Sequence, residues 1–158
     1  MSASAVYARR FVSLVKLEHT VFALPYAYAG AILAEDRVPS AAKLFWITVA
    51  MVGARSLAMA LNRLIDAEID ARNPRTSRRE IPAGLLTRGQ VLAFCAGSLA
   101  VFLVAVWQLP PLTHVLWPIP VAGFVVYPYL KRYTWLCHAV LGAVDGLAPV
   151  GGWIAVTG

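Results

Sequence analysis

The sequence predicts an all-α fold, a polytopic membrane protein built as a bundle of about five transmembrane helices. Hydrophobic residues make up 59% of the 158 residues, and charged residues only 14%. The mean hydropathy of +0.67 lies well above the soluble average. The apolar residues are also gathered in long stretches without the polar stripes that a water-soluble helix bundle needs.

Five apolar stretches are the candidate membrane helices. A helix needs about 20 residues to cross the hydrocarbon core of a bilayer. The four later stretches meet that length, whereas the first does so only if it begins near Leu17 or runs past Ala34. In chain order, the stretches cover residues 21–33, 44–61, 91–109, 112–130 and 136–156.

The lysines and arginines predict the orientation of these helices. With the N-terminus inside, eleven basic residues flank the spans on the cytoplasmic side and two lie outside, while Arg55 falls within the second span. Cytoplasmic loops carry the excess of basic residues. We therefore expect an integral protein of the cytoplasmic (inner) membrane, in contact with membrane lipid. The net charge of +6 then reflects topology, and no nucleic-acid partner is expected because no base-reading or stacking element is visible.

The loop after the second span begins with the most informative segment, NRLIDAEIDARNPRTSRRE. Asn62, Asp66 and Asp70 are spaced by four residues, so on a helix one amide and two carboxylates share a face. Such oxygen ligands suit Mg²⁺, which usually also bridges to phosphate oxygens. The arginines that follow offer planar groups for phosphate: Arg72, Arg75, Arg78 and Arg79. The segment indicates a Mg²⁺–diphosphate site, and the alternative is a solvated helix end with i,i+4 charge pairs.

Two charged residues lie inside predicted spans, where a charge is unfavourable unless it faces a cavity or a partner. Arg55 precedes Asn62 by two helical turns and so lies on the face of the acidic motif. Asp145 lies in the last span, among glycines and Pro149 that we expect to loosen the helix. Two compatible interpretations stay open: the two side chains pair across the bundle, or they line a substrate cavity.

The fourth span ends in YPYLKRYT, where Tyr127 and Lys131 are again four residues apart. We expect them at the same level of the membrane as Asp66 and Asp70. Lys131 either extends to the lipid headgroups, the common behaviour of such a residue, or binds a diphosphate oxygen with the Tyr127 hydroxyl in support. Pro128 between them predicts a break or kink in the helix.

Taken together, these motifs resemble the UbiA-type intramembrane prenyltransferases, and most closely the 4-hydroxybenzoate polyprenyltransferases and related enzymes of menaquinone biosynthesis. The resemblance is carried by KLEHTVFALPYAYAGA, NRLIDAEIDARNPRTSRREIPAG and YPYLKRYT, and it covers nearly the whole chain. It implies nine membrane helices around a central cavity, with one aspartate-rich motif after the second helix and another after the sixth.

Only the first of these motifs is found in the sequence. The resemblance therefore implies that residues 1–158 form a single, incomplete domain of this type, without its C-terminal helices and second aspartate-rich motif. We expect the isolated chain to be inactive and a C-terminal half to be among its partners.

The resemblance implies transfer of a polyprenyl group from polyprenyl diphosphate to an aromatic acid such as 4-hydroxybenzoate, in quinone biosynthesis. Mg²⁺ is the implied cofactor, with Asn62, Asp66 and Asp70 as its ligands. The residues expected to act in catalysis are Asp66, Asp70, Tyr127 and Lys131. The residues expected to bind substrate are Arg55, Asn62, Arg75, Arg79 and Asp145, with Arg55 on the carboxylate of the acceptor.

Three polar residues precede the first span, namely Lys16, Glu18 and His19. Family members often have cavity-facing polar residues at this place, so the resemblance allows a contact with substrate. Anchoring at the membrane interface is the alternative.

Two other functions stay open. A small ion-coupled transporter would explain Arg55 and Asp145 as a mid-membrane relay, but not the acidic motif and its arginines. A truncated, non-catalytic membrane protein or subunit derived from the family would retain the motif without turnover. Mg²⁺-dependent binding of an isoprenyl diphosphate separates the transporter from the prenyltransferase, and a downstream reading frame that encodes a second DxxxD motif and four spans would decide against the truncated protein.

Overall fold

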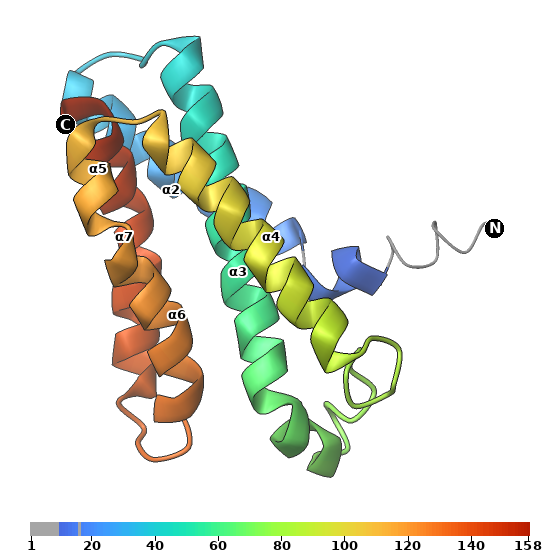
Figure 1. The fold of residues 1–158 in the computed structure, drawn as a ribbon. Helices are drawn as coiled ribbons and strands as arrows, with labels where there is room; N and C mark the ends of the chain where they lie inside the picture. The colour runs from blue at the N-terminus through green and yellow to red at the C-terminus, as the bar shows by residue number, and fades with distance from the viewer. Residues whose placement is uncertain (1–9, 16) are drawn as a thin grey trace, which may run out of the picture.

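The computed structural model describes residues 10–15 and 17–158, and no strand occurs in that part of the chain (Figure 1). Lys16 lies outside the described residues, and so do the side chains of Glu18 and His19, so the expectation for these three residues stays a prediction. Residues 10–15 are helical. The helices that follow are α2 (Leu17–Glu35), α3 (Ala41–Arg72), α4 (Arg88–Trp107), α5 (Pro111–Leu116), α6 (Pro118–Leu130) and α7 (Cys137–Thr157).

Three of the described helices, α3, α4 and α7, are long and apolar enough to cross a membrane, whereas the apolar part of α2 is shorter. α3 is the longest, with 32 residues, and it carries the acidic motif on its last turns. Ser40 caps the start of α3, and its hydroxyl accepts a hydrogen bond from the Lys43 N–H. α4 begins with a capping box between Thr87 and Gln90, which satisfies backbone N–H groups at the helix start.

The fourth predicted span is not a single helix. Trp117 ends α5 and directly precedes α6, whose first residue is Pro118. Proline lacks the N–H that a continuous helix needs and its ring clashes with the preceding turn, so the apolar stretch is divided here.

The prediction of a break at Pro128 is wrong, because α6 continues to Leu130. The alternative, a kink at Pro128, stays a prediction. α7 is likewise continuous across Pro149, so the glycines and proline of the last span do not interrupt it. Membrane helices tolerate such prolines where neighbouring groups satisfy the freed backbone carbonyl.

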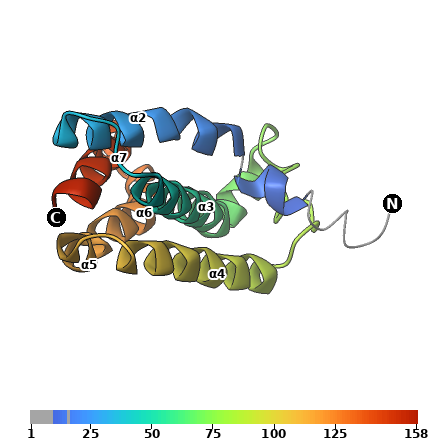
Figure 2. The same cartoon turned by 90° about the horizontal axis from the view of Figure 1, so that it is seen from above.

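The helices are arranged around α3, which lies between α2 and α4 when the molecule is seen from above (Figure 2). α3 packs along α4, and α2 packs along α7. The contact between α2 and α7 depends on small residues: a Cβ added at Gly152 would lie 2.0 Å from the Ala27 carbonyl oxygen. Close backbone approach of this kind is typical of helix pairs in membranes.

One hydrophobic cluster lies next to the end of α3 that carries the acidic motif. It joins residues 10–15 and the turns of residues 73–87 to α3 and α4. Its buried members are Leu14, Val15, Leu57, Ala60, Leu86, Val91 and Cys95. This packing fixes the segment that follows α3 and therefore the arginines that it carries.

Candidate active site

The acidic motif forms a buried, ion-paired group at the end of α3. Asp66 is 2% exposed, and its carboxylate accepts a hydrogen bond from the Lys131 ammonium at the end of α6. The same ammonium donates to Asn62 Oδ1 over 3.3 Å. Arg132 Nη2 lies 3.6 Å from the second oxygen of Asp66. The structure therefore places Lys131 at the level of Asp66, as expected from the sequence, and also brings it into contact with Asn62 and Asp66.

The second aspartate has a cation of its own, supplied by the segment after α3. Asp70 is 6% exposed, and Arg79 Nη1 lies 2.6 Å from its Oδ2. The chain reverses because Asn73 forms a turn, in which its side chain accepts from the Arg75 N–H over 3.0 Å. The Thr76 hydroxyl donates to the Asp70 carbonyl oxygen over 3.0 Å. These contacts place Arg79 against the aspartate nine residues before it.

Other predicted residues lie around this group with fewer contacts. Arg75 is exposed, and no described residue forms an ion pair with it. Tyr127 is half-buried, and the Lys131 ammonium lies 5.6 Å from the centroid of its ring. Lys131 contacts the acidic motif itself, and its expected contact with a headgroup or a diphosphate stays a prediction.

Arg132 is a site residue that the sequence analysis did not single out. Its guanidinium donates to the Ile65 carbonyl oxygen over 2.8 Å and lies 5.1 Å from the centroid of the Tyr129 ring. Its position directly after Lys131 was the available signal. Lys131 and Arg132 both reach Asp66 because the end of α6 packs against α3, and the sequence alone does not show this contact.

The donor set fits a hard divalent cation in chemical type. Asn62, Asp66 and Asp70 offer oxygen ligands alone, as Mg²⁺ prefers. Asp66 Oδ1 is buried without a hydrogen-bond partner among the described residues, so one acceptor is still available. No group of three or more His, Cys, Asp or Glu residues suited to a metal occurs within residues 10–15 and 17–158. The Mg²⁺ site therefore stays a prediction.

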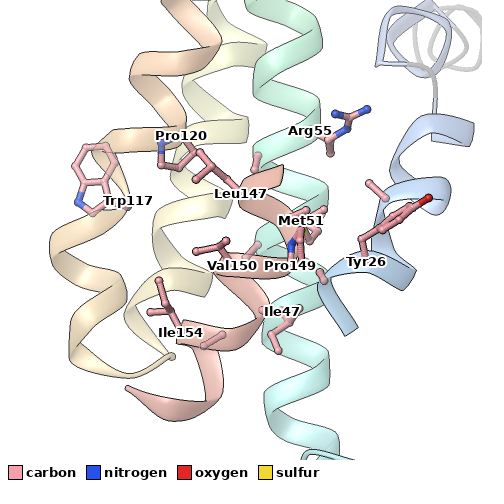
Figure 3. A pocket seen from close by; sticks show the side chains of 18 of the residues that line it. Tyr26, Ile47, Met51, Arg55, Trp117, Pro120, Leu147, Pro149, Val150 and Ile154 are labelled. Carbon is pink, nitrogen blue, oxygen red and sulfur yellow. The ribbon is translucent and has the colours of Figure 1, made fainter. Parts of the chain in front are cut away.

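An apolar cavity of about 920 Å³ lies further along the bundle, lined by residues of α2 to α7 (Figure 3). Arg55 and Asp145 are the charged residues in its lining, and they form an ion pair of 2.8 Å. The two side chains thus pair, as the first interpretation predicted, and they also line a cavity, whose role in binding substrate stays a prediction. Arg55 Nε is buried without a hydrogen-bond partner among the described residues. That Arg55 and Asp145 bind a substrate is not tested by this geometry.

The cavity and the aspartates are joined by α3. Arg55 lies two turns before Asn62, a separation of about 10 Å along a helix. Asn62, Asp66 and Asp70 are not among the residues that line the cavity. The arrangement can therefore hold a charged headgroup at one level and an apolar chain at another.

Comparisons with known proteins agree with this architecture. The UbiA prenyltransferase family matches residues 23–158. A protoheme IX farnesyltransferase of Methylococcus capsulatus is 34% identical over 99% of this chain and 53% of its own length. The protein of the same name from Alkalilimnicola ehrlichii is 37% identical, over 97% of this chain and 52% of its own length. These names do not confirm the aromatic acid predicted as acceptor.

Two solved structures share the fold. A UbiA homologue from Aeropyrum pernix K1 superposes with a TM-score of 0.84 and 35% identity, over 89% of this chain and 51% of that one. A digeranylgeranylglyceryl phosphate synthase gives a TM-score of 0.86 at 17% identity, over 94% and 53% of the two chains, and supports the fold alone. The chain spans about half the length of the curated relatives it matches. It belongs to the UbiA prenyltransferase family.

Proposed function

We propose that the protein containing this chain transfers a prenyl group from a prenyl diphosphate to a ring acceptor in the membrane. One observation carries the proposal: two buried aspartates, each paired with a cation from a different element, lie on the helix that also lines an apolar cavity. A diphosphate headgroup and an apolar isoprenoid tail require these two environments side by side.

The aspartate end suits the leaving group. Asn62, Asp66 and Asp70 would hold Mg²⁺, which when bound neutralises the diphosphate and stabilises it as it leaves. Lys131 and Arg79 are the cations on the two carboxylates in this structure, and both are partly exposed. In the proposed reaction they turn to the diphosphate oxygens and stabilise the negative charge that develops there. Arg75 is exposed and adds a third cation near this end.

The cavity suits the tail and the reactive carbon. Cleavage of the bond between the prenyl carbon and the diphosphate oxygen leaves an allylic cation, and the electron pair departs with the diphosphate. Apolar walls exclude water from that cation. The ring of the acceptor then attacks the cation, and loss of a ring proton restores its aromaticity.

We propose an aromatic acid such as 4-hydroxybenzoate as the acceptor, with its carboxylate on Arg55. Arg55 suits this role because it is a guanidinium in the cavity lining, and the side chain of its partner Asp145 is 53% exposed. Protoheme IX is the second candidate, because the relatives described above are named for it. It also carries carboxylates, so both acceptors offer Arg55 the same chemical group.

We further propose that the aspartate end faces the cytoplasm from the inner membrane, because the basic residues are concentrated on that side. The relatives are about twice as long as this chain. Their length supports the proposal that further helices and a second aspartate-rich motif complete the domain.

The test is an assay of membranes that contain the complete protein, supplied with Mg²⁺ and radiolabelled farnesyl or longer prenyl diphosphates. 4-Hydroxybenzoate and protoheme IX are offered in separate reactions. A labelled product with one acceptor supports prenyl transfer and identifies the ring. No product with either, together with solute flux in proteoliposomes, would favour the transporter. Neither product nor flux would favour the non-catalytic membrane protein.

A further inference from the structure

Residues 10–15 are hydrogen-bonded to the segment that carries the arginines, defined here as residues 73–87. The Ser13 hydroxyl donates to Glu80 Oε1 over 2.8 Å, and Arg10 Nη1 donates to the Leu85 carbonyl oxygen over 2.9 Å. These contacts join residues 67 and 75 positions apart in the chain. The proposed reaction does not use these two hydrogen bonds, so their role has to be a different one.

Glu80 is the buried centre of this contact. It is 9% exposed, although glutamate is rarely buried unless it is paired. Its carbonyl oxygen accepts hydrogen bonds from the N–H groups of Leu85 and Leu86 over 2.8 and 3.0 Å. The backbone of Glu80 and its Oε1 are thus held by hydrogen bonds, whereas Oε2 is buried without a hydrogen-bond partner among the described residues. The residue directly before Glu80 is Arg79, which pairs with Asp70.

A second buried charge lies on α3 near this residue. Arg63 is 8% exposed, and its Nε has no hydrogen-bond partner among the described residues. Its guanidinium interacts electrostatically with Arg79, Glu80, Asp70 and Asp66. Glu80 and Arg63 therefore contribute opposite charges to the surroundings of Arg79, which is itself partly exposed.

We propose that Glu80 and Arg63 are positioning residues, which hold Arg79 where it meets the diphosphate. The inference rests on the proposed function for the identity of the anion. Without the negative charge of Glu80, the repulsion between Arg63 and Arg79 is less compensated, and Arg79 moves away from the site. Without both Glu80 and Arg63 the net charge around Arg79 is that of the wild type, and Arg79 keeps its place on Asp70.

Three variants of the complete protein test this proposal: Glu80→Gln, Arg63→Met and the double variant. Glutamine still accepts from Ser13, so Glu80→Gln removes the charge and keeps the hydrogen bond. We expect Glu80→Gln to raise the KM for the prenyl diphosphate about tenfold with kcat nearly unchanged. The double variant returns KM to within about threefold of the wild type, because it restores the wild-type net charge around Arg79.

A second readout needs no turnover. Trypsin cleaves after arginine, and the 73–87 segment contains Arg75, Arg78 and Arg79. We expect Glu80→Gln to be cleaved in this segment several times faster than the wild type, and the double variant to be cleaved at nearly the wild-type rate. The matched control is Glu68→Gln, which removes a carboxylate that is 77% exposed on the same helix end.

The two proposals fail in different ways. Unchanged KM and cleavage in Glu80→Gln would overturn the positioning role, and so would a double variant that is worse than both single variants. If the wild type has no activity with any prenyl diphosphate but cleavage changes as expected, the positioning of Arg79 is supported and the proposed function is overturned. A single variant that does not fold, beside a double variant that does, supports the charge balance.

Discussion

Two regions of α3 balance their charges in opposite ways. At the aspartate end, Asp66 and Asp70 are 2% and 6% exposed, and each is met by a cation from another element. In the cavity, Arg55 has one partner, Asp145, whose side chain is 53% exposed. The aspartate end is called the closed region here because its carboxylates are buried. The cavity is called the open region because Asp145, one member of its ion pair, is exposed.

The difference indicates what each region can exchange. Breaking a buried ion pair strands the remaining charge and is strongly unfavourable unless another ion replaces the lost partner. At the aspartate end, a metal ion can therefore replace Lys131 and Arg79 on the carboxylates when an anion binds. Partners can be exchanged at lower cost in the cavity, because Asp145 is already partly exposed.

The largest expected effect is that of Asp66→Ala, which tests the closed region. The substitution removes a predicted Mg²⁺ ligand and leaves Lys131 and Arg132 without their carboxylate. We expect kcat for prenyl transfer to fall by about 10³-fold or more. Initial rates in membranes containing the complete protein measure the loss.

The matched control for that variant is Glu68→Ala, two residues further along α3. Glu68 is exposed and pairs with Arg88 across the surface. We expect it to keep its activity within about twofold. Normal turnover by Asp66→Ala would refute the metal assignment.

The walls of the cavity depend on the close contact between α2 and α7, which Gly152→Ala tests. The added Cβ would lie 2.0 Å from the Ala27 carbonyl oxygen, so the two helices have to separate. We expect a loss of about 3 kcal/mol in stability, at the upper end for overpacking. Gly151→Ala is the control, because a Cβ there meets nothing within 4 Å. Thermal unfolding in detergent compares the two, and equal melting temperatures would contradict this account of the contact.

Arg55→Gln tests the open region. Glutamine removes the positive charge that we propose for the acceptor carboxylate and leaves Asp145 without its ion pair. We expect the KM for the acceptor to rise about tenfold, while the KM for the prenyl diphosphate is unchanged. Steady-state kinetics with each substrate varied in turn separate the two. A rise in the KM for the prenyl diphosphate alone would mean that Arg55 binds the diphosphate headgroup and not the acceptor.

Local spacing made the shared face of the motif predictable. Asn62, Asp66 and Asp70 lie on one helix, where intervals of four residues dictate a common face. Arg55 and Asp145 were predictable as a pair because a charge in a membrane helix needs a partner or a cavity. Both inferences require only the geometry of one helix and the cost of burying charge.

The rest depends on contacts between distant parts of the chain. In the sequence, Arg63 is one of several arginines that the predicted loop contains, but in the structure it is buried, at 8% exposure. Glu80 is held by Ser13, which is 67 residues away in the chain. Pro118 could have signalled the division of the fourth span, whereas the break predicted at Pro128 does not occur, since α6 continues through it. Whether a proline ends a membrane helix depends on what satisfies the freed carbonyl.

The smallest expected effect belongs to the ion pair between Arg88 and Glu68, which sharpens the comparison from outside both regions. The two side chains are 57% and 77% exposed, and their atoms lie 2.9 Å apart, almost the length of the Arg55–Asp145 pair. Solvent screens an exposed pair, and holding two long side chains together costs entropy. We therefore expect Arg88→Gln to change stability by less than about 1 kcal/mol and to leave both KM values unaltered. Thermal unfolding and kinetics at low and moderate salt measure this. A large loss of stability would mean that distance rather than burial governs the strength of these ion pairs. The contrast between the closed and the open region would then have no energetic meaning.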